Sequence, residues 1–184
     1  MARLIDDLLS LSRIELNAHR RPDAPVELIP IVRQVVDGLQ TLARDRGVVI
    51  EVDADDAITV LGDRDELVRL FENLVENALK YGAAGKRVDV KLSRGITAES
   101  EAEAIVSVRD YGPGIAPEHV PRLTERFYRV DVRESRAQGG TGLGLALVKH
   151  ILNRHRGRLS IESAPGAGAT FTVHLPIVTP RPST

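Results

Sequence analysis

The sequence predicts an α/β fold, a two-layer sandwich in which helices cover one face of a mixed β-sheet, preceded by a short N-terminal helix. Three observations predict this class. Apolar residues recur at helical spacing in several segments, short β-branched runs lie between them, and 184 residues suit one hydrophobic core. We therefore expect one main domain with a short appendage.

Composition excludes several classes of protein. With 42% hydrophobic and 28% charged residues, the chain is expected to be globular rather than disordered. The 25 Lys and Arg against 26 Asp and Glu leave no basic field, so no nucleic-acid partner is expected. The absence of cysteine excludes disulfides and suits a cytoplasmic domain. No apolar run approaches the roughly 18 residues that span a bilayer, so any membrane anchor should lie outside this chain.

The N-terminal part divides into a helix and a linker. Residues 1–17 place apolar side chains at helical spacing, so this amphipathic helix must pack on another element. Residues 18–26 contain two prolines among polar residues, which predicts a linker. The main domain is expected to cover residues 27–178, and residues 179–184 form a tail.

After the linker, Pro30 suits the first turn of a helix that Gly47 ends. The β-branched runs at 48–52 and 58–61 predict short strands. The next helix is long and has clear end signals.

This long helix is expected to run from its N-cap, Asp63, to Tyr81. Glu66 follows the cap by three residues, as in a capping box, and Gly82 can end the helix. The remaining elements are strands at 86–94 and 104–110, a long loop at 111–140, a helix at 141–155 and a hairpin of strands at 159–163 and 170–175.

The strongest chemical signal is the glycine-rich run at 139–145, called the glycine loop below, which opens into the last helix. Glycines let the backbone approach a phosphate, and the following helix N-terminus supplies N–H groups and a favourable dipole. The run is not a P-loop, because Lys and Ser or Thr do not follow its last glycine. Taken alone, it fits a plain tight turn equally well.

A second motif, Asp110-Tyr111-Gly112-Pro113-Gly114, follows an apolar strand. A buried carboxylate at a strand end can accept a hydrogen bond from an exocyclic amine such as that of adenine, and glycines let a flat ring approach. The alternative is an ordinary Asp turn after a strand. The glycine loop downstream favours the first interpretation.

A third motif lies on the long helix, where Asn73 and Asn77 share a face with Lys80. Amide oxygens can ligate a Mg²⁺ ion that keeps waters and phosphate oxygens as its other ligands, and a lysine adds a countercharge. A solvated helix face is the alternative for any one of these residues.

These motifs, together with Glu125-Arg126-Phe127-Tyr128-Arg129, resemble the ATP-site motifs of bacterial sensor histidine kinases. They correspond in order to the asparagine box, first glycine box, phenylalanine box and second glycine box, and the resemblance covers about residues 27–176. It implies the Bergerat-type sandwich with ATP and Mg²⁺ as cofactors. The nucleotide-binding residues that it implies are Asn73, Asn77, Lys80, Tyr81, Asp110, Gly112, Gly114, Ile115, Phe127, Gly140, Thr141, Gly142, Leu143, Gly144, Leu145 and Thr170.

The resemblance also assigns roles within that set. Asn77 would ligate Mg²⁺ with Asn73 beside it, Lys80 and Tyr81 would lie near phosphates, and Asp110 would read adenine. Residues 115–139, called the lid segment below, would form the ATP lid with Phe127 as its apolar anchor. The cations expected near phosphates or a partner domain are Arg129, Arg133 and Arg136, although each fits a solvated basic loop equally well. Lys80 and Arg129 are the candidate catalytic residues.

The helix at 1–17 resembles the end of the second helix of the family's dimerisation and phosphoacceptor hairpin, with an unrelated amphipathic helix as the alternative. The histidines are His19, His119, His150, His155 and His174. None of them is followed by an acidic residue as the family's phosphoacceptor is, so we expect that histidine outside this chain. The resemblance further implies a response regulator as partner and a full-length homodimer anchored at the inner membrane.

The expected activity is therefore transfer of the γ-phosphoryl group of ATP to a histidine in two-component signalling. Hydrolytic relatives carry a Glu where Asn73 stands, and an amide cannot take a proton from water, which argues against fast hydrolysis. The alternatives are an ATP-binding scaffold without transfer and a Ser/Thr kinase of the anti-sigma type. Within the family, the run from 147 to 159 looks most like phosphate-starvation sensor kinases.

Overall fold

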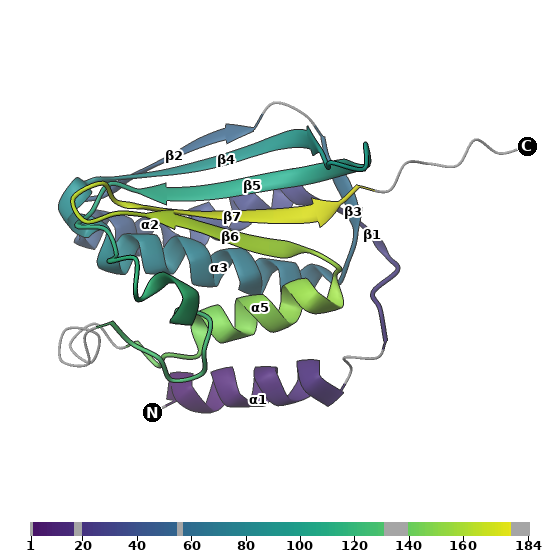
Figure 1. Cartoon of the computed structure of the whole chain (residues 1–184), viewed down its shortest axis with the longest axis horizontal. Coiled ribbons are helices and arrows are strands. Elements are labelled where there is room, and N and C mark those ends of the chain that lie inside the picture. The colour runs from purple at the N-terminus through teal and green to yellow at the C-terminus, as the bar shows by residue number, and fades with distance from the viewer. Residues whose placement is uncertain (1, 17–19, 55–56, 131–139, 178–184) are drawn as a thin grey trace, which may run out of the picture.

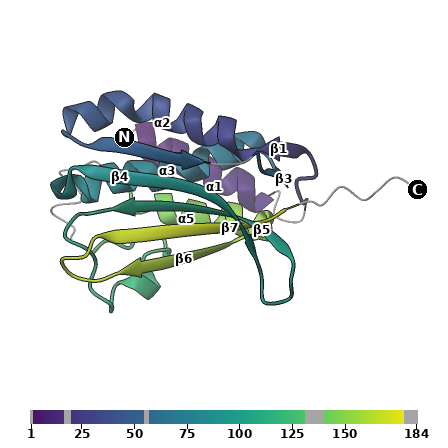
Figure 2. The same cartoon turned by 90° about the horizontal axis from the view of Figure 1, so that it is seen from above.

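The computed structural model describes residues 2–16, 20–54, 57–130 and 140–177. A five-stranded sheet is covered on one face by helices (Figures 1 and 2). The strand order is β2 (Val49–Ala54), β4 (Arg87–Ile96), β5 (Ala102–Asp110), β7 (Ala169–Pro176) and β6 (Arg158–Ser163). The covering helices are α2 (Leu28–Asp45), α3 (Arg64–Tyr81) and α5 (Gly144–Arg154). Because β2 and β4 pair in parallel and the other neighbours pair antiparallel, the predicted mixed sandwich is confirmed.

Alternation along the central strands builds the core. On β5, Ala104, Val106 and Val108 are buried against the helices, and the residues between them are more exposed or face the other side. Successive side chains of a strand point to opposite faces, so Asp110 falls on the same side as these apolar residues. The sheet therefore carries a carboxylate to the edge of the hydrophobic core.

Helix α1 (Ala2–Leu16) packs against α5 on the side that faces away from the sheet (Figure 1). Its Leu11 and Ile14 are buried in the core cluster, as its helical spacing predicts. Its other large apolar residues, Ile5, Leu8, Leu9 and Leu16, are exposed. Among the described residues, no helix combines the length and apolar character needed to cross a membrane.

The structure corrects two predicted boundaries. The last part of the predicted linker forms β1 (Pro25–Glu27), which pairs antiparallel with β3 (Thr59–Leu61). The predicted helix at 141–155 begins only at Gly144, because Gly142 adopts a φ of 72° and the Thr141 hydroxyl accepts the N–H of Leu143. A left-handed residue cannot continue a right-handed helix, so the glycine loop is a turn before α5. Short 3-10 helices lie at Ala83–Gly85 (η1) and, in the long loop, at Val120–Arg122 (η2).

The start of α3 confirms the N-cap but not the capping box. The Asp63 carboxylate accepts the N–H groups of Asp65 and Glu66 at 3.0 and 3.1 Å. The reciprocal bond is absent, since the Asp63 N–H donates to His155 Nε2 at 3.0 Å and Glu66 pairs with Arg154 instead. A buried histidine has taken the place that the capping box assigns to Glu66.

His155 can fill this role only while it is neutral. Its Nδ1 lies 2.8 Å from the carbonyl oxygen of Ile151, so Nδ1 carries the proton and Nε2 accepts. The ring is 2% exposed, and burial lowers the pKa of His155. Protonation would replace the acceptor at Nε2 with a second donor that faces an N–H.

We predict that His155 makes folding stability fall in weakly acidic solution. Because its pKa is lower in the folded chain, its contribution is complete above the unfolded value of about 6.5 and declines as the pH falls through that value. Burial raises the pKa of the neighbouring Glu66, which acts in the opposite direction. Urea unfolding at pH 7.5 and 5.5 should show a smaller pH-dependent loss for His155→Gln than for the wild type. Equal losses would contradict this role.

Candidate functional site

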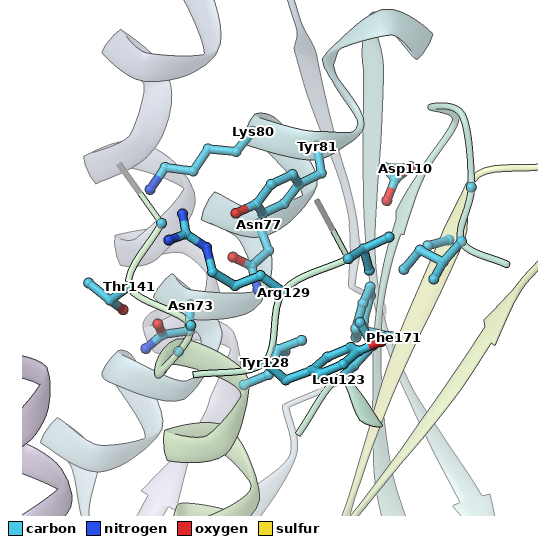
Figure 3. Close-up of a pocket in the computed structure, with 18 of the residues that line it drawn as sticks. Asn73, Asn77, Lys80, Tyr81, Asp110, Leu123, Tyr128, Arg129, Thr141 and Phe171 are labelled. Atoms are coloured by element: carbon cyan, nitrogen blue, oxygen red, sulfur yellow. The ribbon is translucent and has the colours of Figure 1, made fainter. Parts of the chain in front are cut away.

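One cavity collects most of the predicted site residues. It is bounded by α3, the end of β5, β7, the lid segment and the glycine loop (Figure 3). The predicted residues that line it are Asn73, Asn77, Lys80, Tyr81, Asp110, Gly114, Ile115, Gly140, Thr141, Gly142, Gly144 and Leu145, and Arg129 joins them. Arg133, Arg136 and Gly139 lie outside the described residues, as do His19 and the tail. Motifs far apart in sequence therefore meet at one place.

Asp110 is held at the cavity wall by backbone amides. Its Oδ1 accepts the N–H of Gly112 at 2.9 Å, and the N–H of Ala169 also donates to this carboxylate. The residue is 6% exposed, and burial raises the pKa of Asp110 against the opposing effect of these two amides. A buried carboxylate fixed in this way can accept a hydrogen bond from a ligand amine.

Glycines allow this close packing around Asp110. A Cβ on Gly82 would lie 2.2 Å from the Asp110 Cβ, and one on Gly168 would lie 2.1 Å from the Asp110 carbonyl oxygen. Gly168 also has a φ of 73°. Side chains at either position would force the turn after β5 away from α3 or from β7. Neither glycine was singled out as part of a site by the sequence motifs.

The polar face of α3, formed by Asn73, Asn77 and Lys80, lines the cavity next to α5. Asn73 Nδ2 donates to the carbonyl oxygen of Arg69 at 2.7 Å, which fixes the amide orientation. A Cβ on Gly144 would lie 2.6 Å from Asn73 Oδ1, so this glycine lets the two helices approach. About two turns further along α3, Lys80 is buried and pairs with Glu76 at 2.8 Å.

The glycine loop is tied to the lid segment. Gly142 has a φ of 72°, its carbonyl oxygen accepts the Phe127 N–H at 2.8 Å, and a Cβ there would lie 2.9 Å from the Phe127 Cα. Leu143 is buried and does not line the cavity. Its described neighbours in the loop line the cavity, where the 11-residue helix α5 begins.

Several predicted site residues do not line the cavity. The prediction of Phe127 as apolar anchor is wrong, because its φ of 62° reverses the chain and its side chain is left 58% exposed. Thr170 does not line the cavity, since strand alternation puts it on the opposite face of β7 from Ala169 and Phe171, which do. Gly112 also lies outside the lining and acts on the site through its bond to Asp110.

The lining residues that the sequence did not assign to the site come from four parts of the chain, and Pro113 and Tyr128 among them lie within the quoted motifs. The full set is Asp7, Pro113, Leu123, Tyr128, Val130, Ala169 and Phe171. Asp7 offered one sequence signal, because helical spacing puts this acidic residue on the same stripe as Leu11 and Ile14. An acidic residue on a buried stripe requires a partner.

Asp7 finds those partners at the cavity. Its Oδ1 accepts from Arg69 at 3.2 Å and its Oδ2 accepts from the Thr141 hydroxyl at 2.8 Å, while its side chain is 8% exposed. Near the other end of α1, Glu15 pairs with Arg126 of the lid segment. Helix α1 thus supplies part of the cavity wall and contacts the glycine loop through Thr141 and the lid segment through Arg126.

Residues 62–179, which contain all four motifs, match the model of the histidine kinase-, DNA gyrase B-, and HSP90-like ATPase family. The chain belongs to this family. Its similarity within the ATPase family is to sensor histidine kinases, and the domain is of the ATP-binding type found in them.

Two curated relatives of this ATPase domain illustrate the similarity. The phosphate regulon sensor protein PhoR of Pseudomonas aeruginosa is 42% identical over 174 residues, which are 95% of this chain and 38% of the relative. The sensor-like histidine kinase SenX3 of Mycolicibacterium smegmatis is 41% identical over 96% of this chain and 44% of its own length. The chain thus spans less than half the length of these relatives.

Solved structures agree in fold. The mycobacterial sensor histidine kinase MprB superposes with a TM-score of 0.70 and 29% identity over 84% of this chain and 97% of that one. Full-length ShkA, solved in complex with AMPPNP, superposes with a TM-score of 0.78 and 29% identity over 96% of this chain and 36% of that one. The latter match extends beyond the ATPase domain into most of the N-terminal part.

We predict that Asp7→Ala releases α1 from the rest of the domain. Thr141 and Arg69 would lose a partly buried charged acceptor, at a cost of about 1–3 kcal/mol. Hydrogen exchange at the α1 amides should accelerate by about fivefold or more, as that energy implies. Asp6→Ala, which alters an exposed carboxylate on the same helix, is the control and should leave the exchange unchanged. Equal exchange in both variants would show that apolar packing alone holds α1.

Proposed function

We propose that this domain binds Mg-ATP in the cavity and donates the γ-phosphoryl group to a histidine on a hairpin outside this chain. The observation that carries the proposal is the single cavity with a buried carboxylate, Asp110, at one side and the glycine loop at another. A carboxylate acceptor suits the 6-amino group of adenine. Backbone N–H groups of the glycine loop and the start of α5 suit phosphates.

The donor set between these two sides fits magnesium. Asn73 and Asn77 offer neutral oxygen donors, which are hard ligands suited to a cation that retains water and phosphate oxygens. Within the described ranges, no group of three or more His, Cys, Asp or Glu could hold a metal ion, so phosphate oxygens would complete the coordination. When bound, the ion neutralises phosphate charge.

This chain's own residues would orient and neutralise the triphosphate. Lys80 and Arg129 both line the cavity and supply cations on two of its sides, one from α3 and one from the lid segment. Asn73 stands where the hydrolytic members of the superfamily place a Glu, and an amide cannot act as general base toward water. The domain therefore favours transfer to an external acceptor over hydrolysis, with positioning and charge as its main contributions.

The acceptor and the larger assembly are part of the same proposal. We assign α1 to the end of the dimerisation and phosphoacceptor hairpin, and residues 27–178 to the catalytic domain. The full-length protein would be a membrane-anchored homodimer at the inner membrane that passes phosphate to a response regulator. Similarity to the PhoR and SenX3 sensors supports a two-component kinase over an anti-sigma-type kinase. Similarity to PhoR, a phosphate regulon sensor, also supports the phosphate-starvation group.

Transfer is tested with the full-length protein and γ-labelled ATP. We expect label on a histidine N-terminal to this domain, stable to base and lost in acid, when Mg²⁺ is present. The isolated domain should label a separately supplied hairpin from the same protein. Nucleotide binding without any labelling in either arrangement would instead identify an ATP-binding scaffold.

We predict that Asp110→Asn weakens ATP binding by about tenfold or more, because a hydrogen bond to a charged acceptor is worth about 1.5–3 kcal/mol. The melting temperature without nucleotide should hold or rise, since burial already disfavours the Asp110 charge. Calorimetric titration of ATP, with and without Mg²⁺, measures the loss. Asp53→Asn removes a carboxylate from the exposed strand β2 and serves as the control. Unchanged affinity in Asp110→Asn would exclude this carboxylate from adenine recognition.

A further inference from the structure

Tyr128 lines the cavity, whereas its neighbour Phe127, which the family resemblance assigned as the apolar anchor of the lid segment, does not. Tyr128, Leu123 and Phe171 all line the cavity, and Figure 3 shows them toward the end opposite Lys80. The left-handed φ of Phe127 reverses the chain just before Tyr128. That reversal leaves the Phe127 side chain outside the cavity and brings the Tyr128 side chain to it.

The Tyr128 hydroxyl is hydrogen-bonded to His119, a residue outside the cavity lining. His119 Nδ1 lies 2.6 Å from the Tyr128 hydroxyl, and the two ring centroids are 6.2 Å apart. His119 itself does not line the cavity. A hydroxyl can donate or accept, so this bond can form with either protonation state of the imidazole.

Arg122 restrains the ring as well. Its guanidinium carbon lies 4.2 Å from the centroid of the Tyr128 ring, in a cation–π contact, and it also pairs with Glu125. Both members of that ion pair are more than half exposed, so the pair itself is a weak restraint. The hydrogen bond to His119 is the more specific contact.

The backbone brings these side chains together through repeated turns. Each N–H donates to the carbonyl three residues earlier, in the series His119 to Ala116, Arg122 to His119, Glu125 to Arg122 and Tyr128 to Glu125. These turns form the part of the lid segment that carries His119, Arg122 and Tyr128. The hydrogen bond from the Phe127 N–H to the Gly142 carbonyl oxygen joins this run of turns to the glycine loop.

We propose that His119 is a positioning residue that fixes Tyr128 as a wall against the nucleotide. The inference rests on the proposed function, because it assigns the ligand of the cavity as ATP. Tyr128 touches the ligand and His119 acts through it. Without the hydrogen bond the ring can leave the wall, and part of the binding energy must then be used to restore it.

The test is a double-mutant cycle on ATP affinity in the whole domain, measured by calorimetry with Mg²⁺. Tyr128→Phe keeps the ring and removes the hydroxyl, and His119→Ala removes its partner. Each single variant should weaken ATP binding by about threefold to tenfold, the value of one hydrogen bond. The double variant should be no weaker than either single one, because both remove the same interaction.

Two further variants separate positioning from general damage. His119→Asn retains a polar group near the place of Nδ1 and should recover most of the affinity. Tyr111→Phe removes a hydroxyl that bonds Asp89 outside the cavity, and should bind ATP as the wild type does. Melting temperatures without nucleotide should stay within a few °C for all variants, since each variant removes a single hydrogen bond between side chains that are not fully buried.

The outcomes distinguish this inference from the proposed function. Wild-type binding with unchanged affinity in Tyr128→Phe and His119→Ala would overturn the positioning role and leave the ATP site intact. Additive losses in the double variant would also overturn it, because the two side chains would then act separately. No ATP binding by the wild type would overturn the proposed function and this inference together.

Discussion

The buried carboxylate of Asp110 sets the constraint around which this domain is arranged. It lies at the end of β5, on the core side of the sheet, and accepts N–H groups from Gly112 and from the neighbouring strand. Burial without those amides would be costly. Gly82 and Gly168 must then lack side chains, because any Cβ there would collide with the Asp110 residue. Glycine at these two positions therefore follows from the place of Asp110.

The glycine loop is hydrogen-bonded to two other segments that line the cavity. The glycine loop bonds the lid segment through Gly142 and Phe127, and bonds α1 through Thr141 and Asp7. Helix α1 precedes the stretch that matches the ATPase family, yet it contributes a wall residue. Movement of α1 or of the lid segment would thus alter the same short loop. The N-terminal helix α1 therefore contacts the cavity directly, through Asp7.

The sequence was sufficient for the features that depend on local spacing. The apolar periods predicted the sandwich, and the resemblance to sensor histidine kinases implied that Asn73, Asn77 and Asp110 share one site. Features set by tertiary contact were missed. The orientation of Phe127 depends on a backbone reversal that its residue type does not indicate, and the Asp7 contact joins residues 134 positions apart. The wrong placement of Thr170 at the cavity has the same origin, since a shift of one residue along β7 moves a side chain to the opposite face of the sheet.

The central claim is that Asp110 recognises the 6-amino group of a purine triphosphate. Parallel calorimetric titrations with ATP and inosine triphosphate test it most directly, because the two nucleotides differ in the purine ring only by the 6-amino and 6-oxo groups and the attached ring proton. We expect inosine triphosphate to bind at least about tenfold more weakly, since its 6-oxo group would face the Asp110 carboxylate and the 6-position carries no donor. Equal affinity for the two nucleotides would contradict the account.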